Sequence, residues 1–157
     1  MQKHIEGGYF VETDRSISTV TNPYEHKDDV DDTTRNESTL IYYLLTPHSP
    51  SGRFHRNKSR TIHVLHRGKA KYVLIHPDGT LETFNVGQDV ANGEKLQWIV
   101  EGGDYKASYI TTTEPCLISE VVIPGFDYRD HNFMATREEL VNLVGEKIAT
   151  DWEWLLH

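Results

Sequence analysis

Short runs of strand-forming residues, separated by turns at regular intervals, restrict how this chain can fold more than any other feature. The runs are rich in β-branched and aromatic side chains, which favour extended backbone. Turn residues such as Pro77-Asp78-Gly79 stand between them and recur roughly every 8–12 residues, a spacing typical of β-sandwiches and barrels. The pattern predicts an all-β fold with strands at Thr39–Leu45, Thr61–Leu65, Ala70–His76, Leu81–Val86, Leu96–Val100, Tyr105–Thr112 and Cys116–Ile123.

A single short helix is expected near the C-terminus, over about residues 136–147. Thr136 and Glu139 have the spacing of a capping box, in which each side chain bonds the other residue's backbone amide. Leu140 and Val144 then recur on one face, and Gly145 marks the end. Residues 151–156 are expected to form a short terminal turn.

Residues 22–38 are polar, and we expect them to form an exposed acidic loop. Four aspartates lie here, but the segment lacks the glycine and the closing glutamate of a calcium-binding loop. With 157 residues, the chain is expected to be a single domain over 1–157.

The overall charge excludes several classes of partner. The formal net charge is −8, whereas domains that bind nucleic acid or anionic lipid carry basic surfaces. The longest apolar run, Leu40–Leu45, is too short to span a bilayer, and residues 1–10 contain no apolar signal core. The only cysteine, Cys116, cannot form an intrachain disulfide and is expected to be a buried structural thiol. We therefore expect a cytoplasmic protein with no nucleic-acid or membrane partner.

Histidines are frequent, and four of the nine lie between His55 and His76. The stretch from Ser51 to Gly68, with Phe54-His55-Arg56 at its centre, resembles the first motif of the cupins. The opening Glu6-Gly7-Gly8-Tyr9-Phe10 and the closing Pro124-Gly125-Phe126-Asp127-Tyr128 are similar to a small cupin family of the cupin 5 type, long known as a domain of unknown function. The resemblance covers residues 4 to about 140.

This resemblance implies a double-stranded β-helix, or jelly-roll, barrel that encloses a ligand cavity and forms a homodimer. It also places the cupin metal-ligand positions at His55, Asn57, Thr61 and Lys106, of which only His55 is a good transition-metal ligand. No cofactor is therefore expected. The alternative left open is a divalent transition metal on His55 and His63, with a third ligand such as Glu120 or Asp104.

Two sets of site residues follow. The candidate catalytic residues are His55, His63 and Tyr105, because imidazoles exchange protons near neutral pH and a tyrosine can oppose them. If Thr61 points inward, strand alternation also points His63 inward, where it could share a cavity with His55. The candidate ligand-binding residues are Tyr43, Arg53, Asn57, Thr61, Lys71 and Phe126.

Each of these residues also has a purely structural interpretation. His55 and His63 could be hydrogen-bonded interior residues without chemistry, and Tyr43 and Tyr105 could be core aromatics. Arg53 and Lys71 could be solvated charges on the rim instead of an anion clamp, so an anionic or oxygen-rich ligand is permitted but not required.

The favoured function is that of a small-molecule-binding cupin with metal-independent His acid/base chemistry. The reaction would be that of an isomerase or epimerase, a lyase or a cyclase, on a small polar or ring-containing metabolite. The alternatives are a non-catalytic ligand-binding cupin and a metal-dependent oxygenase or decarboxylase.

Overall fold

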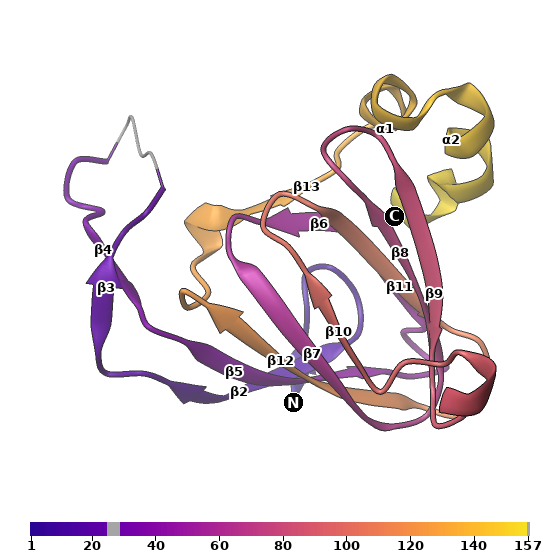
Figure 1. Cartoon of the computed structure of the whole chain (residues 1–157), viewed down its shortest axis with the longest axis horizontal. Coiled ribbons are helices and arrows are strands. Elements are labelled where there is room, and N and C mark those ends of the chain that lie inside the picture. Colours follow the sequence, from indigo (N-terminus) through magenta and orange to yellow (C-terminus); the bar gives the residue numbers. More distant parts are fainter. Residues whose placement is uncertain (25–28, 157) are drawn as a thin grey trace.

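Two antiparallel sheets face each other and form a barrel (Figure 1). A computed structural model describes residues 1–24 and 29–156 of the chain. The six-stranded sheet has the order β1 (Gln2–Lys3), β2 (Tyr9–Arg15), β5 (Thr39–Leu45), β12 (Cys116–Ile123), β7 (Arg60–Arg67), β10 (Gln97–Val100). The five-stranded sheet has the order β13 (His131–Phe133), β6 (Ser51–Asn57), β11 (Tyr105–Ile110), β8 (Ala70–Ile75), β9 (Leu81–Val86). The predicted all-β, double-sheet barrel is confirmed.

Strand alternation divides the apolar side chains between two cores. Along β8, Tyr72 and Leu74 point between the sheets, and Val73 and Ile75 point to the outer face. The helices cover that outer face, so β8 is buried on both sides. The inner core also includes Leu65, Trp98 and Ile118, and the outer core includes Phe54, Leu140, Ala149 and Leu155.

The predicted single helix over about 136–147 is wrong in its extent, because two helices are present. α1 (Arg137–Val144) begins at the predicted capping box, in which Thr136 Oγ1 accepts from the Glu139 amide at 3.2 Å. Gly145, with φ 84° and ψ 162°, ends α1, and α2 (Glu146–Trp152) and the 3-10 helix η3 (Glu153–Leu156) follow it. None of the helices in the described ranges is long and apolar enough to cross a bilayer.

The expected acidic loop at 22–38 is also corrected in part. β3 (Thr19–Thr21) pairs with β4 (Thr34–Asn36), and Asp32 is buried. The buried Arg35 guanidinium donates to Asp32 Oδ2 at 2.9 Å and to Asp130 Oδ2 at 2.7 Å, so both carboxylates share its positive charge. Asp130 belongs to the 3-10 helix η2 (Tyr128–Asp130), so this network ties the loop to the later chain. Asp28 lies outside the described residues.

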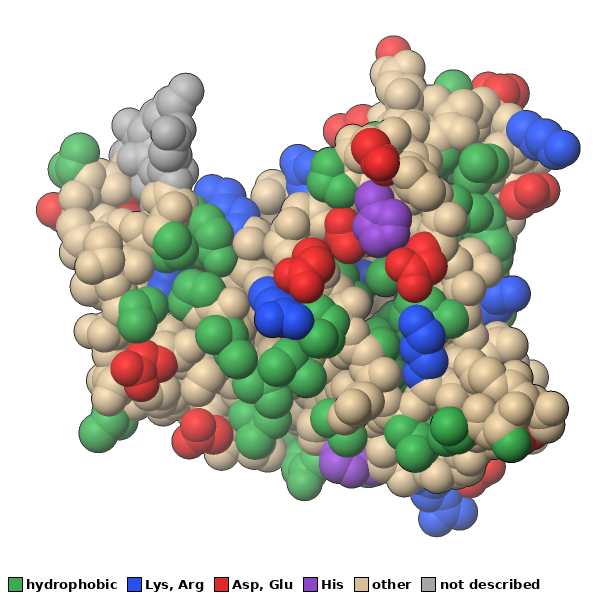
Figure 2. All heavy atoms as spheres, viewed as in Figure 1, with side chains coloured by type: hydrophobic (Ala, Val, Ile, Leu, Met, Phe, Trp, Pro, Cys, Tyr) green, Lys and Arg blue, Asp and Glu red, His purple; other side chains and the backbone are tan. Residues whose placement is uncertain are grey.

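The outer face of the six-stranded sheet is not covered in the way that the outer face of the five-stranded sheet is. Helices of the described chain lie over the five-stranded sheet and leave this face open (Figure 1). Figure 2 shows apolar side chains gathered on the near surface, in the region of β7 and β12. A further 3-10 helix, η1 (Val90–Asn92), lies between β9 and β10.

Candidate functional site

A cavity of about 440 Å³ lies between the two sheets, at the end where the N-terminal strands and β13 meet. This volume falls within the range of about 300–1,000 Å³ that is typical of small-molecule sites. Strands β2, β5 and β12 supply one side, and β6 and β13 supply the other. The lining residues are Gln2, His4, Glu6, Phe10, Glu12, Arg15, Thr39, Ile41, His55, Asn57, Glu120, Val122, Phe126, Asp127, Tyr128 and His131.

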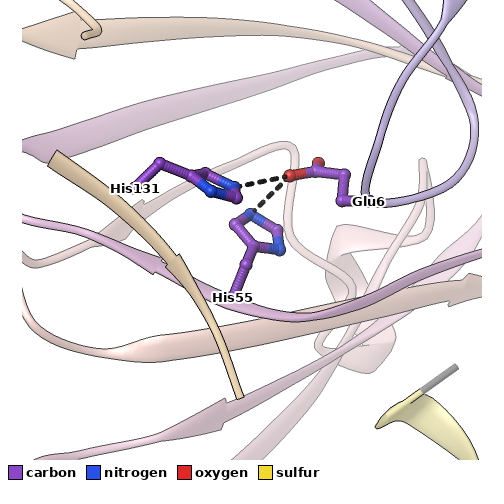
Figure 3. Close-up of side chains that lie close together, drawn as sticks. All are labelled: Glu6, His55 and His131. Atoms are coloured by element: carbon purple, nitrogen blue, oxygen red, sulfur yellow. Dashed lines mark ion pairs between the residues drawn. The ribbon is translucent and has the colours of Figure 1, made fainter. Parts of the chain in front are cut away.

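Three of these residues, Glu6, His55 and His131, form a compact centre in the cavity wall (Figure 3). Glu6 Oε2 lies 2.9 Å from His55 Nε2 and 3.7 Å from His131 Nε2. The two imidazole rings are stacked, with centroids 5.2 Å apart. Glu6 comes from the turn between β1 and β2, so residues far apart in the chain make one site.

A β-bulge aims His55 at this centre. Lys106 pairs with His55 and Ser108 pairs with Gly52, so two residues of β6 stand opposite one residue of β11. The extra residue reverses the alternation, which lets Phe54 pack under the helices while His55 faces the cavity. His55 Nδ1 donates to the Arg53 carbonyl at 2.8 Å, because a carbonyl oxygen can only accept. Both ring nitrogens therefore face acceptors, an arrangement that suits the imidazolium form.

Electrostatics keep the Glu6 carboxyl ionised. Burial alone would raise its pKa, but the charge of His55 and contacts with His131 outweigh burial and hold the pKa well below its ordinary value. Burial lowers the pKa of His4, whose Nδ1 accepts from the Glu6 amide at 3.2 Å. The centre is thus a carboxylate surrounded by imidazoles, a group able to hold and pass protons.

A second buried cluster joins Lys106, His63 and Glu120 across the barrel. Lys106 Nζ lies 2.8 Å from His63 Nε2 and 2.9 Å from Glu120 Oε2. Burial, reinforced by the Lys106 charge, lowers the pKa of His63, which is therefore a neutral acceptor. Burial would raise the pKa of Glu120, but Lys106 and His63 hold it well below its ordinary value.

The predicted pairing of His55 with His63 in one cavity is not observed. The alternation was predicted correctly, because Thr61, His63 and Leu65 are buried. However, β6 and β7 belong to facing sheets, and the His63 ring stacks on Trp98 with centroids 5.2 Å apart. Of the second cluster, only Glu120 lines the main cavity.

Among the predicted ligand-binding residues, Asn57 and Phe126 line the main cavity. Thr61 lines a small adjoining pocket together with Asn57 and Lys106. Tyr43 belongs to the inner core, where its hydroxyl donates to the Gly7 carbonyl at 2.8 Å.

The remaining predicted residues lie away from the cavity. Tyr105 packs in the outer core, and the Arg56 guanidinium lies 4.7 Å from its ring centroid. The Arg53 guanidinium lies 3.7 Å from the Phe133 ring centroid. Alternation along β8 places Lys71 on the outer face with Val73.

Cys116 is buried, as predicted. Burial raises the pKa of its thiol to about 12, so it is not a reactive thiolate.

Comparison with known proteins identifies the family. The family model described as Cupin superfamily (DUF985) matches residues 1–134. This chain is a member of that family. An uncharacterized protein of Saccharomyces cerevisiae is 52% identical over 160 residues, which cover 98% of this chain and 80% of the relative.

Solved structures support the same fold. A hypothetical protein from Leishmania major superposes with a TM-score of 0.82 at 29% identity, covering 98% of this cupin and 92% of that chain. Protein SO0799 from Shewanella oneidensis superposes with a TM-score of 0.79 at 26% identity, covering 98% of this chain and 89% of that chain. Oxalate decarboxylase from Bacillus subtilis superposes with a TM-score of 0.58 at 18% identity, covering 92% of this chain and 37% of that chain. This likeness concerns the fold alone.

Cupins can bind metals, and the donor residues of this chain decide where a metal fits. The positions implied by the resemblance do not fit, because the Lys106 ammonium is held in an ion pair with Glu120. In contrast, the ligand atoms of Glu6, His55 and His131 all lie within 4.8 Å of one another. Two imidazoles and a carboxylate are a set that binds divalent transition metals, and the Arg53 carbonyl orients His55 as an outer-sphere partner would. A metal would therefore be held by Glu6 and His131 with His55, not by His63.

Glu6 and His131 are the site residues that sequence reasoning missed. Glu6 lies in the opening motif, and His131 follows the closing motif. Neither has a local spacing to His55 that indicates a shared site. The pairing of β13 with β6 sets His131 beside Asn57, and the Arg53 amide donates to the Glu6 carbonyl at 2.8 Å, so contacts between distant segments bring both residues to β6.

Proposed function

We propose that this cupin binds a small molecule in the 440 Å³ cavity and catalyses proton transfer on it, without a metal ion. The observation that carries the proposal is the buried Glu6 carboxylate beside two imidazoles at the cavity wall. The reaction class is isomerisation or epimerisation, elimination or cyclisation, because each needs one group to remove a proton and another to return it. A cytoplasmic location and a homodimer are parts of the same proposal.

The roles follow from the surroundings of each group. His55, with both ring nitrogens against acceptors, is the acid. We assign His131 as the base, because its ring lines the cavity and its Nε2 lies 3.7 Å from Glu6 Oε2, beyond hydrogen-bond distance. The Glu6 carboxylate stabilises the imidazolium that forms during the transfer.

The apolar wall completes the site. Phe10, Ile41, Val122 and Phe126 line the cavity together with the polar centre. They would exclude water around the reacting atoms and hold the carbon skeleton of the ligand, which strengthens the electrostatic interactions inside.

The test uses fractionated metabolites, because the substrate is not known. Purified protein is incubated with each fraction in D₂O, and mass spectrometry detects compounds that gain deuterium or change into isomers. His55→Gln and His131→Gln should each lower the rate about 10²–10⁴-fold, the usual weight of acid–base catalysis. The matched control is His48→Gln, because His48 is exposed on a turn away from the cavity and its change should leave the rate intact.

Two results would contradict the proposal. One is an unchanged rate in both folded variants. The other is a compound that copurifies with the protein and is recovered without exchange, which would favour binding without chemistry.

A second candidate is a metal-dependent oxygenase or decarboxylase, favoured by the convergence of Glu6, His55 and His131 within 4.8 Å. A bound metal would supply Lewis-acid or redox chemistry at the cavity wall. Elemental analysis distinguishes the two candidates. Near-stoichiometric transition metal that is lost in His131→Gln but kept in His48→Gln would replace the metal-independent proposal.

A further inference from the structure

The positive charges around the cavity are already paired with carboxylates. Its lining holds four carboxylates but one arginine, Arg15. Arg15 Nε and Nη2 donate to the two Glu12 oxygens, each at 2.9 Å, and Nη1 donates to Asn36 Oδ1 at 2.9 Å and to the Phe126 carbonyl at 3.1 Å. Four of its five N–H donors are therefore committed, and its charge is paired with Glu12, so a ligand anion would find only a weak partner there.

The other cations near the cavity are committed as well. The His55 imidazole is held by the Glu6 carboxylate and the Arg53 carbonyl, Lys106 is held by Glu120 and His63, and Arg129 is held by Asp127 at 2.8 Å. Arg53 and Lys71, the expected anion clamp, lie away from the lining. Among the described lining residues, carboxylate oxygens thus outnumber uncommitted donors.

A buried acceptor beside the centre indicates that the ligand carries a hydrogen-bond donor. Asn57 Oδ1 is inaccessible to solvent and has no hydrogen-bond partner among the described residues. Asn57 lines the cavity and pairs in register with His131 across β6 and β13. An unsatisfied buried acceptor is costly, so a ligand donor that meets this oxygen, once the Asn57 side chain turns toward the cavity, would gain free energy.

The cavity also offers a place for a flat ring. Phe126 packs edge-to-face against Tyr128 with centroids 4.9 Å apart and against His131 at 6.0 Å. The three rings form an aromatic corner next to the polar centre. Aromatic faces attract cations as well as rings, which again favours a positively charged group over a negative one.

We propose that this cavity selects uncharged or cationic ring compounds that donate hydrogen bonds from an amine or amide to Asn57 and Glu6, and that it rejects anionic ligands of the same shape. The proposal takes the location of the site from the proposed function but does not depend on turnover.

Three small probes of matched shape test this selection: benzylamine, benzamide and benzoate. Binding is measured by titration, following the imidazole ¹⁵N resonances of His55 and His131. Benzylamine and benzamide should shift both resonances, and benzoate should bind at least about tenfold more weakly, because like charges repel across a binding surface. Benzoate affinity equal to that of benzamide, or no binding by any probe at millimolar concentration, would overturn the proposal.

Two variants locate the contact. Asn57→Leu should weaken benzamide several-fold, as loss of one hydrogen bond does. Asn132→Leu is the matched control, because Asn132 is exposed on β13 and should leave the affinity unchanged. An unchanged affinity in Asn57→Leu would remove Asn57 from the proposal. Selection for amines in a protein that catalyses no exchange would refute the proposed reaction and leave the ligand class standing.

Discussion

Lys106 is the residue on which the buried charges between the sheets depend. Lys106 is 5% exposed, and its ammonium bonds both Glu120 and His63. Lys106→Met keeps an unbranched side chain one atom shorter but leaves the Glu120 carboxylate buried without its cation. Breaking a buried pair from one side costs about 3–5 kcal/mol, and we expect a loss of that size in urea denaturation.

Lys69→Met is the matched control for this prediction. Lys69 Nζ lies 2.7 Å from Glu94 Oε1, but its side chain is 45% exposed, so water replaces the lost contact. Its substitution should change the free energy of unfolding far less. Equal losses in the two variants would show that Lys106 contributes no more than a surface pair.

The sequence identified some site residues and missed others, for a physical reason. His55, Asn57 and Phe126 lie in motifs and line the cavity as expected. Alternation predicted that His63 points inward, but a period of two gives the face of a strand and not the sheet to which it belongs. The β-bulge at Arg53-Phe54 leaves no mark on the pattern, so the orientation of His55 was not predictable from alternation.

At the level of elements, the positions of strands in the sequence were predicted far better than the pairing between strands. β5, β9 and β12 match the predicted ranges residue for residue, because turns bound them on both sides. Pairings depend on contacts between distant segments, and a local pattern cannot supply them. The helix start was predicted from its capping box, whereas the second helix escaped because Gly145 indicates an end equally well with or without a helix after it.

Gly145 offers a test of how much the joint between α1 and α2 depends on glycine. Its φ of 84° with ψ of 162° is a conformation essentially confined to glycine, and an added Cβ would meet nothing within 4 Å. Gly145→Ala should therefore cost about 1–3 kcal/mol through backbone strain alone. Thermal or urea unfolding measures the loss.

Gly93 is the matched control for that substitution. Its φ of 88° and ψ of 6° lie in the left-handed region, which other residues enter at lower cost, and an added Cβ there also meets nothing within 4 Å. Gly93→Ala should be the milder of the two changes. The reverse order would mean that the joint adopts another backbone conformation in solution.

At the scale of the whole molecule, the two sheets are covered unequally. The helices bury the outer face of the five-stranded sheet, while apolar side chains on the six-stranded sheet stay 37–42% exposed: Val11, Tyr42, Val64 and Ile99. Val11 pairs with Tyr42, and Ser119 lies between Tyr42 and Val64, so three of these residues follow one line across the sheet. Exposed apolar side chains gathered on one face of a sheet commonly mark a contact site in proteins.

We predict that a second copy of the chain covers this face, in agreement with the homodimer implied by the family resemblance. Light scattering after gel filtration should give twice the 18.1 kDa of one chain. Val64→Arg should shift the mass toward the monomer, because a buried unpaired charge opposes association. Val90→Arg, at a residue 56% exposed on η1 and outside this line, should leave the dimer intact. A monomeric mass for the unaltered chain would contradict the dimer, and a dimer that tolerates Val64→Arg would place its interface elsewhere.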